Sequence, residues 1–142
     1  MPTTVTVDQA EKAANLAFRT VWLAAGEADA AVAWQNVDFN TEAVQEYVRF
    51  TLLHSSGEAA ALGSEYYRMF GIIMIKVFVH RNTSITRRNA MVEPCLDFLQ
   101  QVDNWPAGFR FTNQGVNNLG PGGGDWDQTN VTAEFDYDTI RT

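Results

Sequence analysis

The chain has 142 residues, a net charge of −7 and a pI near 4.6, and it is long enough for one domain (1–142) with its own hydrophobic core. Hydrophobic residues make up 46% of the sequence and charged residues 19%, so we expect flexible ends only, at residues 1–7 and 140–142. The acidic charge, with no basic cluster beyond Arg87-Arg88, argues against a sequence-specific nucleic-acid binder.

Cysteine content and hydropathy bear on the protein's compartment. Cys95 is the only cysteine, which excludes an internal disulfide and fits a reducing cytoplasm. The N-terminal sequence lacks a basic start followed by an apolar stretch, and no apolar run approaches the ~18 residues of a membrane span. We therefore expect no contact with a membrane.

The first half of the chain predicts a helix followed by three strands. Apolar residues recur at helical spacing from Asp8 to about Ala25, Asp8 with Glu11 resembles a capping box, and Gly26 can end the helix. A short strand is expected near 31–35 and a second strand over 46–55. The polar, alanine-rich stretch 56–65 then predicts a long, mobile hairpin loop.

The third strand, from Tyr67 to His80, is the most informative run because both of its alternating faces are largely apolar. One face reads as pure core: Met69, Gly71, Ile73, Ile75, Val77 and Val79. The other face carries Phe70, Ile72, Met74, Lys76, Phe78 and His80. This second face requires a cover, which is either one of the chain's own helices or another sheet or subunit.

The second half of the chain predicts a helix and two further strands. Ser84 or Thr86 can cap a helix that is kinked at Pro94 or restarts there, and that ends at 105–108. A strand begins at 109–112, and the glycine-rich run 120–124 predicts a flexible loop or hinge.

The last strand, 126–139, alternates cleanly. It places Glu134, Asp136 and Asp138 on one face, which is typical of a solvated strand face, with the wall of an acidic channel as the functional alternative. The whole pattern predicts an α+β domain with a mainly antiparallel sheet of about five strands, two helices packed against it, and the order α-β-β-β-α-β-β.

No motif in the sequence supplies catalytic, cofactor-binding or metal-binding chemistry. His54 and His80 have no partner ligands at zinc spacing, and no serine lies in a nucleophile elbow. The glycine-rich run lacks the Gly-Lys-Ser/Thr ending of a phosphate loop and precedes a strand. Trp126, beside that run, reads either as a core anchor or as an interface aromatic, and Cys95 reads as a small buried residue.

Four segments carry a resemblance to a known family: AWQNVDF after the first helix, YVRFTLLHSSG, the long RMFGIIMIKVFVH strand, and the closing GDWDQTNVTAEFDY. In this order the chain resembles the tail terminator proteins of long-tailed (siphovirus-type) bacteriophages. The resemblance implies a structural virion protein, not an enzyme, that works without cofactors.

The resemblance also implies an assembly. A homo-hexameric ring would cap the tail tube at the head-proximal end of the virion tail after assembly in the host cytoplasm. It would bind the tail tube protein and the head-completion protein, and DNA would pass through it. Interface candidates are Phe70, Ile72, Met74, Lys76, Phe78 and Trp126, and candidates for the lumen wall are Glu134, Asp136 and Asp138.

Two alternatives stay open from the sequence. Another ring-forming head-tail connector or a tail tube protein would share the small α+β domain. A small ligand-binding or hydrolytic α+β domain would need a pocket between the helices and the curved sheet.

Overall fold

The computed structural model describes residues 6–41, 44, 46–59, 66–123 and 125–140, so most of the two expected flexible ends lies outside the described residues. The helices and strands are α1 (Val7–Ala24), β1 (Val32–Trp34), β2 (Glu46–Ala59), β3 (Tyr66–His80), α2 (Ile85–Gln100), β4 (Arg110–Gly123) and β5 (Trp126–Ile140). Short 3-10 turns precede β1 at Asp29–Ala31 and follow α2 at Val102–Asn104. The predicted α+β fold and its element order are confirmed.

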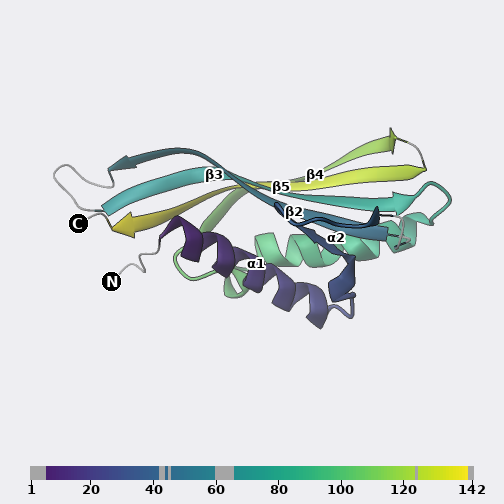
Figure 1. Cartoon of the computed structure of the whole chain (residues 1–142), viewed down its shortest axis with the longest axis horizontal. Coiled ribbons are helices and arrows are strands. Elements are labelled where there is room, and N and C mark those ends of the chain that lie inside the picture. The colour runs from purple at the N-terminus through teal and green to yellow at the C-terminus, as the bar shows by residue number, and fades with distance from the viewer. Residues whose placement is uncertain (1–5, 42–43, 45, 60–65, 124, 141–142) are drawn as a thin grey trace.

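The strands form one sheet in the order β1-β2-β3-β5-β4, in which β1 runs parallel to β2 and the other neighbours are antiparallel. Both helices lie on the same side of this sheet (Figure 1). We call the other side the open face. The possibility that one of the chain's own helices covers the second face of β3 is therefore wrong, because α1 and α2 both pack on the Ile73 side.

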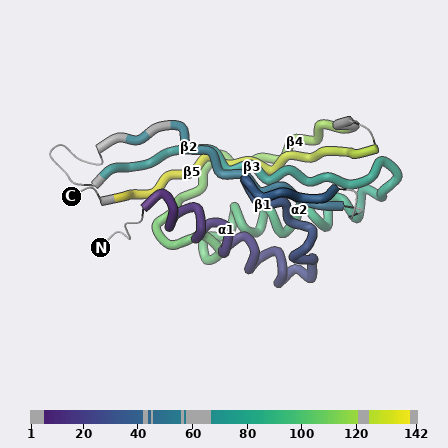
Figure 2. The backbone as a smooth tube through the Cα atoms, viewed as in Figure 1, coloured from purple at the N-terminus to yellow at the C-terminus, as the bar shows by residue number. Residues whose placement is uncertain are grey.

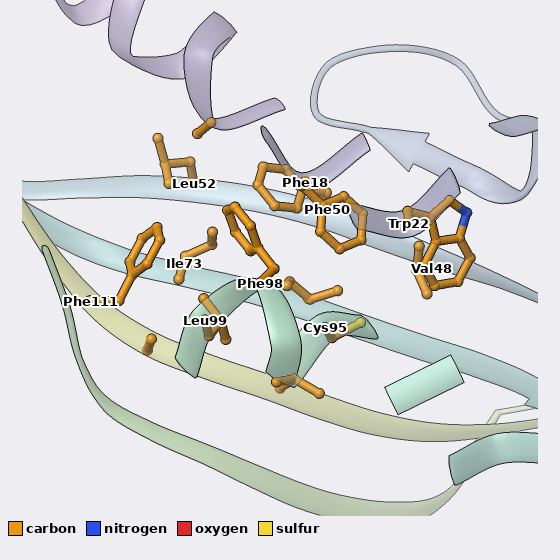
Figure 3. Close-up of a cluster of buried hydrophobic side chains, with 14 of the residues drawn as sticks. Phe18, Trp22, Val48, Phe50, Leu52, Ile73, Cys95, Phe98, Leu99 and Phe111 are labelled. Atoms are coloured by element: carbon orange, nitrogen blue, oxygen red, sulfur yellow. The ribbon is translucent and has the colours of Figure 1, made fainter. Parts of the chain in front are cut away.

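The core fills the space between the helices and the sheet. Phe18 and Trp22 of α1 and Phe98 of α2 meet strand residues such as Phe50 and Ile73, and all five are fully buried (Figure 3). Aromatic rings join the layers, since Phe18 lies 4.7 Å from Phe50 and 5.6 Å from Phe98 between ring centroids. One continuous cluster thus fixes both helices on one face of the sheet.

The N-cap of α1 lies two residues before the predicted one, and the helix begins at Val7 instead of Asp8. Thr6, not Asp8, is the N-cap: its side chain accepts a hydrogen bond from the Gln9 backbone N–H at 3.2 Å, and the Gln9 side chain accepts one from the Thr6 N–H at 3.0 Å. This reciprocal pair is a capping box. Glutamine serves the same role as the expected glutamate, so the residue types alone could not settle the register.

The β2–β3 arm is longer than the sequence predicts, because β2 continues through 56–59 and pairs with β3 as far as Ala59–Tyr67. Residues 60–65 of the expected loop lie outside the described residues. The register shifts between His54 and Ser56, which is a bulge that lets the paired strands bend. Past this bend the strands extend beyond the N-terminal end of α1 (Figure 2).

The second helix runs through Pro94 as a single element, so a restart at Pro94 is wrong. Ser84 is its N-cap and accepts a hydrogen bond from the Arg87 N–H at 3.2 Å. Pro94 is itself buried with Cys95 and Phe98 against the sheet, and this packing offsets the backbone hydrogen bond that proline removes.

The flexible loop predicted for the glycine-rich run 120–124 is wrong for residues 120–123, because these residues belong to β4 and pair with β5. Gly120 adopts a positive φ of 72°, and the register shifts on both sides of Gly120-Pro121, so the pairing continues through bulges. Pro121 is tolerated because β4 is an edge strand. Gly124 lies outside the described residues.

Arg87 joins three segments at one end of the molecule. Its guanidinium donates two hydrogen bonds of 2.8 Å to the carboxylate of Glu27 after α1, and its Nε donates at 2.8 Å to Glu46 at the start of β2. These hydrogen bonds, the larger effect coming from those donated to Glu27 and the smaller from those donated to Glu46, raise the pKa of the Arg87 guanidinium above its ordinary value. The Glu27 side chain is only 8% exposed, so it depends on this partner.

We expect Arg87→Met to lower the free energy of unfolding by about 2 kcal/mol, since Glu27 keeps a desolvated charge without a partner and partial exposure of Arg87 reduces the full buried-pair cost. Urea denaturation followed by circular dichroism measures the change. Arg81→Met, at an exposed turn position, is the matched control and should stay within about 0.5 kcal/mol. Equal stability of the two variants would contradict the assigned role of Arg87.

Cys95 is fully buried on α2, as expected, and its Sγ–H donates to the Met91 carbonyl at 3.4 Å. Burial raises the pKa of the Cys95 thiol, so little thiolate forms even at mildly alkaline pH. We expect the native protein to react with an aromatic disulfide reagent at pH 8 about 100-fold or more slowly than the urea-unfolded protein, since an opening free energy of about 3 kcal/mol suppresses the reactive form by that factor. A fast stoichiometric reaction of the native protein would show that this part of α2 opens freely.

Candidate functional site

The open face is the surface that the fold leaves without a cover, and the second face of β3 lies at its centre. Leu53 of β2 and Ile72 of β3 are direct cross-strand partners there, exposed by 49% and 44%. Phe70 and Met74 of β3 flank them and are half-buried. We call these four residues the aliphatic patch. Large apolar side chains grouped on one exposed sheet face are typical of an interaction surface.

An aromatic cluster lies on the open face at the opposite end of β3. Tyr47 stacks on Phe78 at 4.6 Å between ring centroids, and Trp126 lies 5.2 Å from Tyr47 and 4.4 Å from the His80 ring. Phe39, in the segment after β1, adds a contact of 5.1 Å to Tyr47. The chain therefore covers this end of the open face in part by itself, and Tyr47 is only 6% exposed.

All six interface candidates from the sequence thus share one face, but in different environments. Phe78 and Trp126 belong to the aromatic cluster, Phe70, Ile72 and Met74 belong to the aliphatic patch, and Lys76 lies between the two groups. Trp126 lies on the open face and outside the core cluster, so its reading as a core anchor is wrong, whereas its reading as an interface aromatic stays a prediction.

The three lumen candidates on β5, Glu134, Asp136 and Asp138, lie on this same open face, one strand away from the aliphatic patch. Ile72 pairs in register with Glu134, and Phe70 pairs with Asp136. The open face is therefore divided along the boundary between β3 and β5: large apolar side chains gather on the β2–β3 half, which also carries Arg49, Arg68 and Lys76, and the acids lie on the β5–β4 half.

Two of the three open-face acids of β5 are paired with arginines on the flanking strands. Arg68 of β3 donates to Asp138 at 2.9 Å, and Arg110 of β4 donates to Asp136 at 2.7 Å. Glu134 instead accepts a hydrogen bond from Asn113, which has a positive φ of 53° at a register shift of β4. The sequence-based prediction of an acidic strand face did not include these cross-strand partners.

Two cations lie next to each other between the aromatic cluster and the aliphatic patch. Arg49 of β2 and Lys76 of β3 are paired in register, and within the described part of the chain neither forms an ion pair. Sequence reasoning noted Lys76 but missed Arg49, because only the strand register brings the two charges together. Both side chains are half-buried.

His54 lies on the helix side of the sheet and makes a structural contact. Its Nε2 is 2.5 Å from the Tyr137 hydroxyl, and its Nδ1 is 3.7 Å from a carboxylate oxygen of Glu11. Among the described residues, no group of three or more His, Cys, Asp or Glu side chains is placed to hold a metal ion. In the same part of the chain, neither α1 nor α2 is long and apolar enough to cross a membrane.

The family model described as phage tail terminator protein matches residues 9–100, which include α2, the first three strands and all but the first two residues of α1. The chain belongs to the phage tail terminator family. The resemblance seen in the sequence is thereby confirmed, and the family is one of structural tail proteins, which supports a place in the virion tail. No curated protein matches the sequence.

One solved structure superposes on the chain with a TM-score of 0.59 at 20% sequence identity, over 92% of this chain and 97% of the other. At this identity the likeness shows the fold alone. It extends over β4 and β5, which the family model does not reach, so the complete five-stranded sheet with its two helices is a fold that recurs.

Proposed function

We propose that the protein forms a homo-hexameric ring that caps the phage tail tube, ends tube polymerisation and provides the surface to which the head attaches. Membership of the tail terminator family carries the proposal. The open face supports it, because Leu53 and Ile72 expose apolar surface that a subunit of an assembly can cover. Its partners are further copies of the chain, the tail tube protein and the head-completion protein.

Within this ring we assign the two halves of the open face different roles. The β2–β3 half, with the interface candidates Phe70, Ile72, Met74, Lys76 and Phe78, contacts another protein subunit together with Trp126 at the adjoining start of β5. The β5–β4 half, with Glu134, Asp136 and Asp138, faces the lumen through which DNA passes. Polar residues suit a surface along which a charged polymer slides without sticking.

The test of the function compares tails made by the phage with and without this gene, by negative-stain electron microscopy. Loss of the gene should give overlong tails of variable length without heads, and added wild-type protein should restore a uniform length. Tails of normal length that fail to join heads would instead identify a connector. Filaments formed by the isolated protein would identify a tube protein, and unaffected virions would contradict any role in the tail.

The lumen assignment has its own test, in which Glu134 is changed separately from Asp136 and Asp138 because these two acids are paired with arginines. Glu134→Gln removes the carboxylate that pairs with none of the described arginines, so it should slow DNA ejection from otherwise normal virions if this charge repels the DNA. Asp136→Asn and Asp138→Asn also release Arg110 and Arg68, and adding them should slow ejection further. Wild-type ejection kinetics in the triple variant would contradict a lumen position for this half.

A further inference from the structure

We propose that the β2–β3 half of the open face of one copy docks on the helix layer of the next copy, with Arg49 and Lys76 meeting Glu93 and Asp97 across the contact. The inference rests on the proposed ring and names the two surfaces that build it. The helix layer here means the outward side of α1, α2 and the turn after α2, with Leu16, Glu93, Asp97, Val102 and Asp103.

The cationic side of the contact is costly in an isolated subunit. Arg49 and Lys76 are direct cross-strand neighbours, and like charges in such positions repel. Apolar groups border them on both sides, the Tyr47–Phe78 stack in one direction and Met74 in the other. A partner that covers this surface must therefore bring negative charge to the same place, or it would bury two unpaired cations.

The helix layer carries the complementary charge. Glu93 and Asp97 lie one turn apart on α2, where like charges are unfavourable, and Asp103 is exposed in the turn that follows. None of the three forms an ion pair with another described residue, and the Asp97 carboxylate accepts a 3.3 Å hydrogen bond from the neutral side chain of Gln101. In the contact, the cation pair of the open face and the acid pair of α2 would each lie beside groups of opposite charge.

Apolar groups match as well. Leu16 on α1 and Val102 in the turn after α2 are 63% and 66% exposed, and between α1 and residues 103–107 lies a hollow of about 350 Å³. Ala13, Ala17, Trp105 and Pro106 are among the residues that line it. A branched aliphatic side chain such as Ile72 or Leu53 suits such a hollow, and its burial would stabilise the contact.

The positions of the two surfaces favour a second copy of the chain as the partner that covers the open face. The open face and the helix layer lie on opposite sides of the same chain (Figure 1), so each copy offers one of each. Such a head-to-tail contact is heterologous, and it closes into a ring when the rotation between neighbours permits. A tube or head protein needs only one of these surfaces, whereas self-assembly explains why one chain carries both.

Charge exchange tests the contact directly. One two-residue variant combines Arg49→Glu and Lys76→Glu on the open face, and a second combines Glu93→Lys and Asp97→Lys on the helix layer. A four-residue variant carries all four changes. The control variant carries Arg81→Glu and Asp125→Lys, which reverse charges in exposed turns. Each is assayed for self-association by analytical ultracentrifugation and for restoration of uniform tails in extracts that lack the gene. The two-residue variants should associate at least about tenfold more weakly than wild type, and the four-residue variant should regain both activities.

The outcomes separate this contact from the proposed function. Wild-type behaviour of either two-residue variant overturns the contact and leaves the ring intact. The contact is also overturned if the open-face variant loses self-association and the added helix-layer changes do not restore it. That result would assign the open face to the tube protein, the head protein or DNA. A wild-type protein that neither associates nor limits tail length overturns both proposals. Unchanged thermal unfolding of all variants excludes misfolding as the cause.

Discussion

Replacing Gly71 with alanine should lower the free energy of unfolding by about 3 kcal/mol, the largest effect we expect from adding a single methyl group to this chain. A Cβ at this position would lie 2.2 Å from the backbone oxygen of Leu53 and 2.4 Å from Cζ of Phe135. Neither atom can move away easily. Leu53 belongs to the paired strand beside the bulge, and Phe135 is 2% exposed in the core.

Two further variants isolate the cause of that loss. Gly115→Ala is the matched control, because a Cβ there meets nothing within 4 Å, and it should change stability by no more than about 0.5 kcal/mol. Adding Phe135→Leu to Gly71→Ala should recover part of the loss, since it removes the ring but leaves the overlap with Leu53. Urea unfolding curves with unchanged slopes give the comparison. A Gly71→Ala protein as stable as Gly115→Ala would contradict the close strand packing.

The strands and their faces could be predicted from the sequence because side-chain alternation is local information. The two faces of β3 come out as expected, with Ile73 and Val77 fully buried and Ile72 exposed. The same holds for β5, where Val131 and Phe135 are buried. Alternation also indicated that the second face of β3 is largely apolar, with Lys76 and His80 as its polar residues, and the structure places this face on the open side of the sheet (Figure 1).

Features that depend on pairing between distant segments could not be predicted in this way. Arg68 and Asp138 are 70 residues apart, and only the register of β3 against β5 makes them partners. Likewise, only the register of β2 against β3 makes Arg49 and Lys76 neighbours. Local rules also failed where tertiary contacts outweigh them, at Pro94 inside α2 and at the glycine-rich end of β4.

Phe18 is the residue on which the attachment of both helices to the sheet depends most. Its ring is fully buried and contacts aromatic rings from four elements: Trp22 of α1, Trp34 of β1, Phe50 of β2 and Phe98 of α2. Phe18→Ala should therefore cost about 3–5 kcal/mol, because it removes a large apolar group and leaves a cavity between the layers. The midpoint of thermal unfolding should fall by roughly 10–20 °C in a chain of this size.

Leu16→Ala is the control for Phe18→Ala on the same helix, and it connects stability with assembly. Leu16 is 63% exposed, so its truncation should leave the unfolding midpoint nearly unchanged. If the helix layer docks on the open face of a neighbouring copy, the same variant should weaken self-association, because its exposed side chain borders the hollow beside α1. Calorimetry and sedimentation would then respond to different residues of one helix: Phe18 decides whether the subunit folds, and Leu16 contributes to whether folded subunits meet. A Phe18→Ala protein that unfolds like wild type would contradict the layered core on which both surfaces are built.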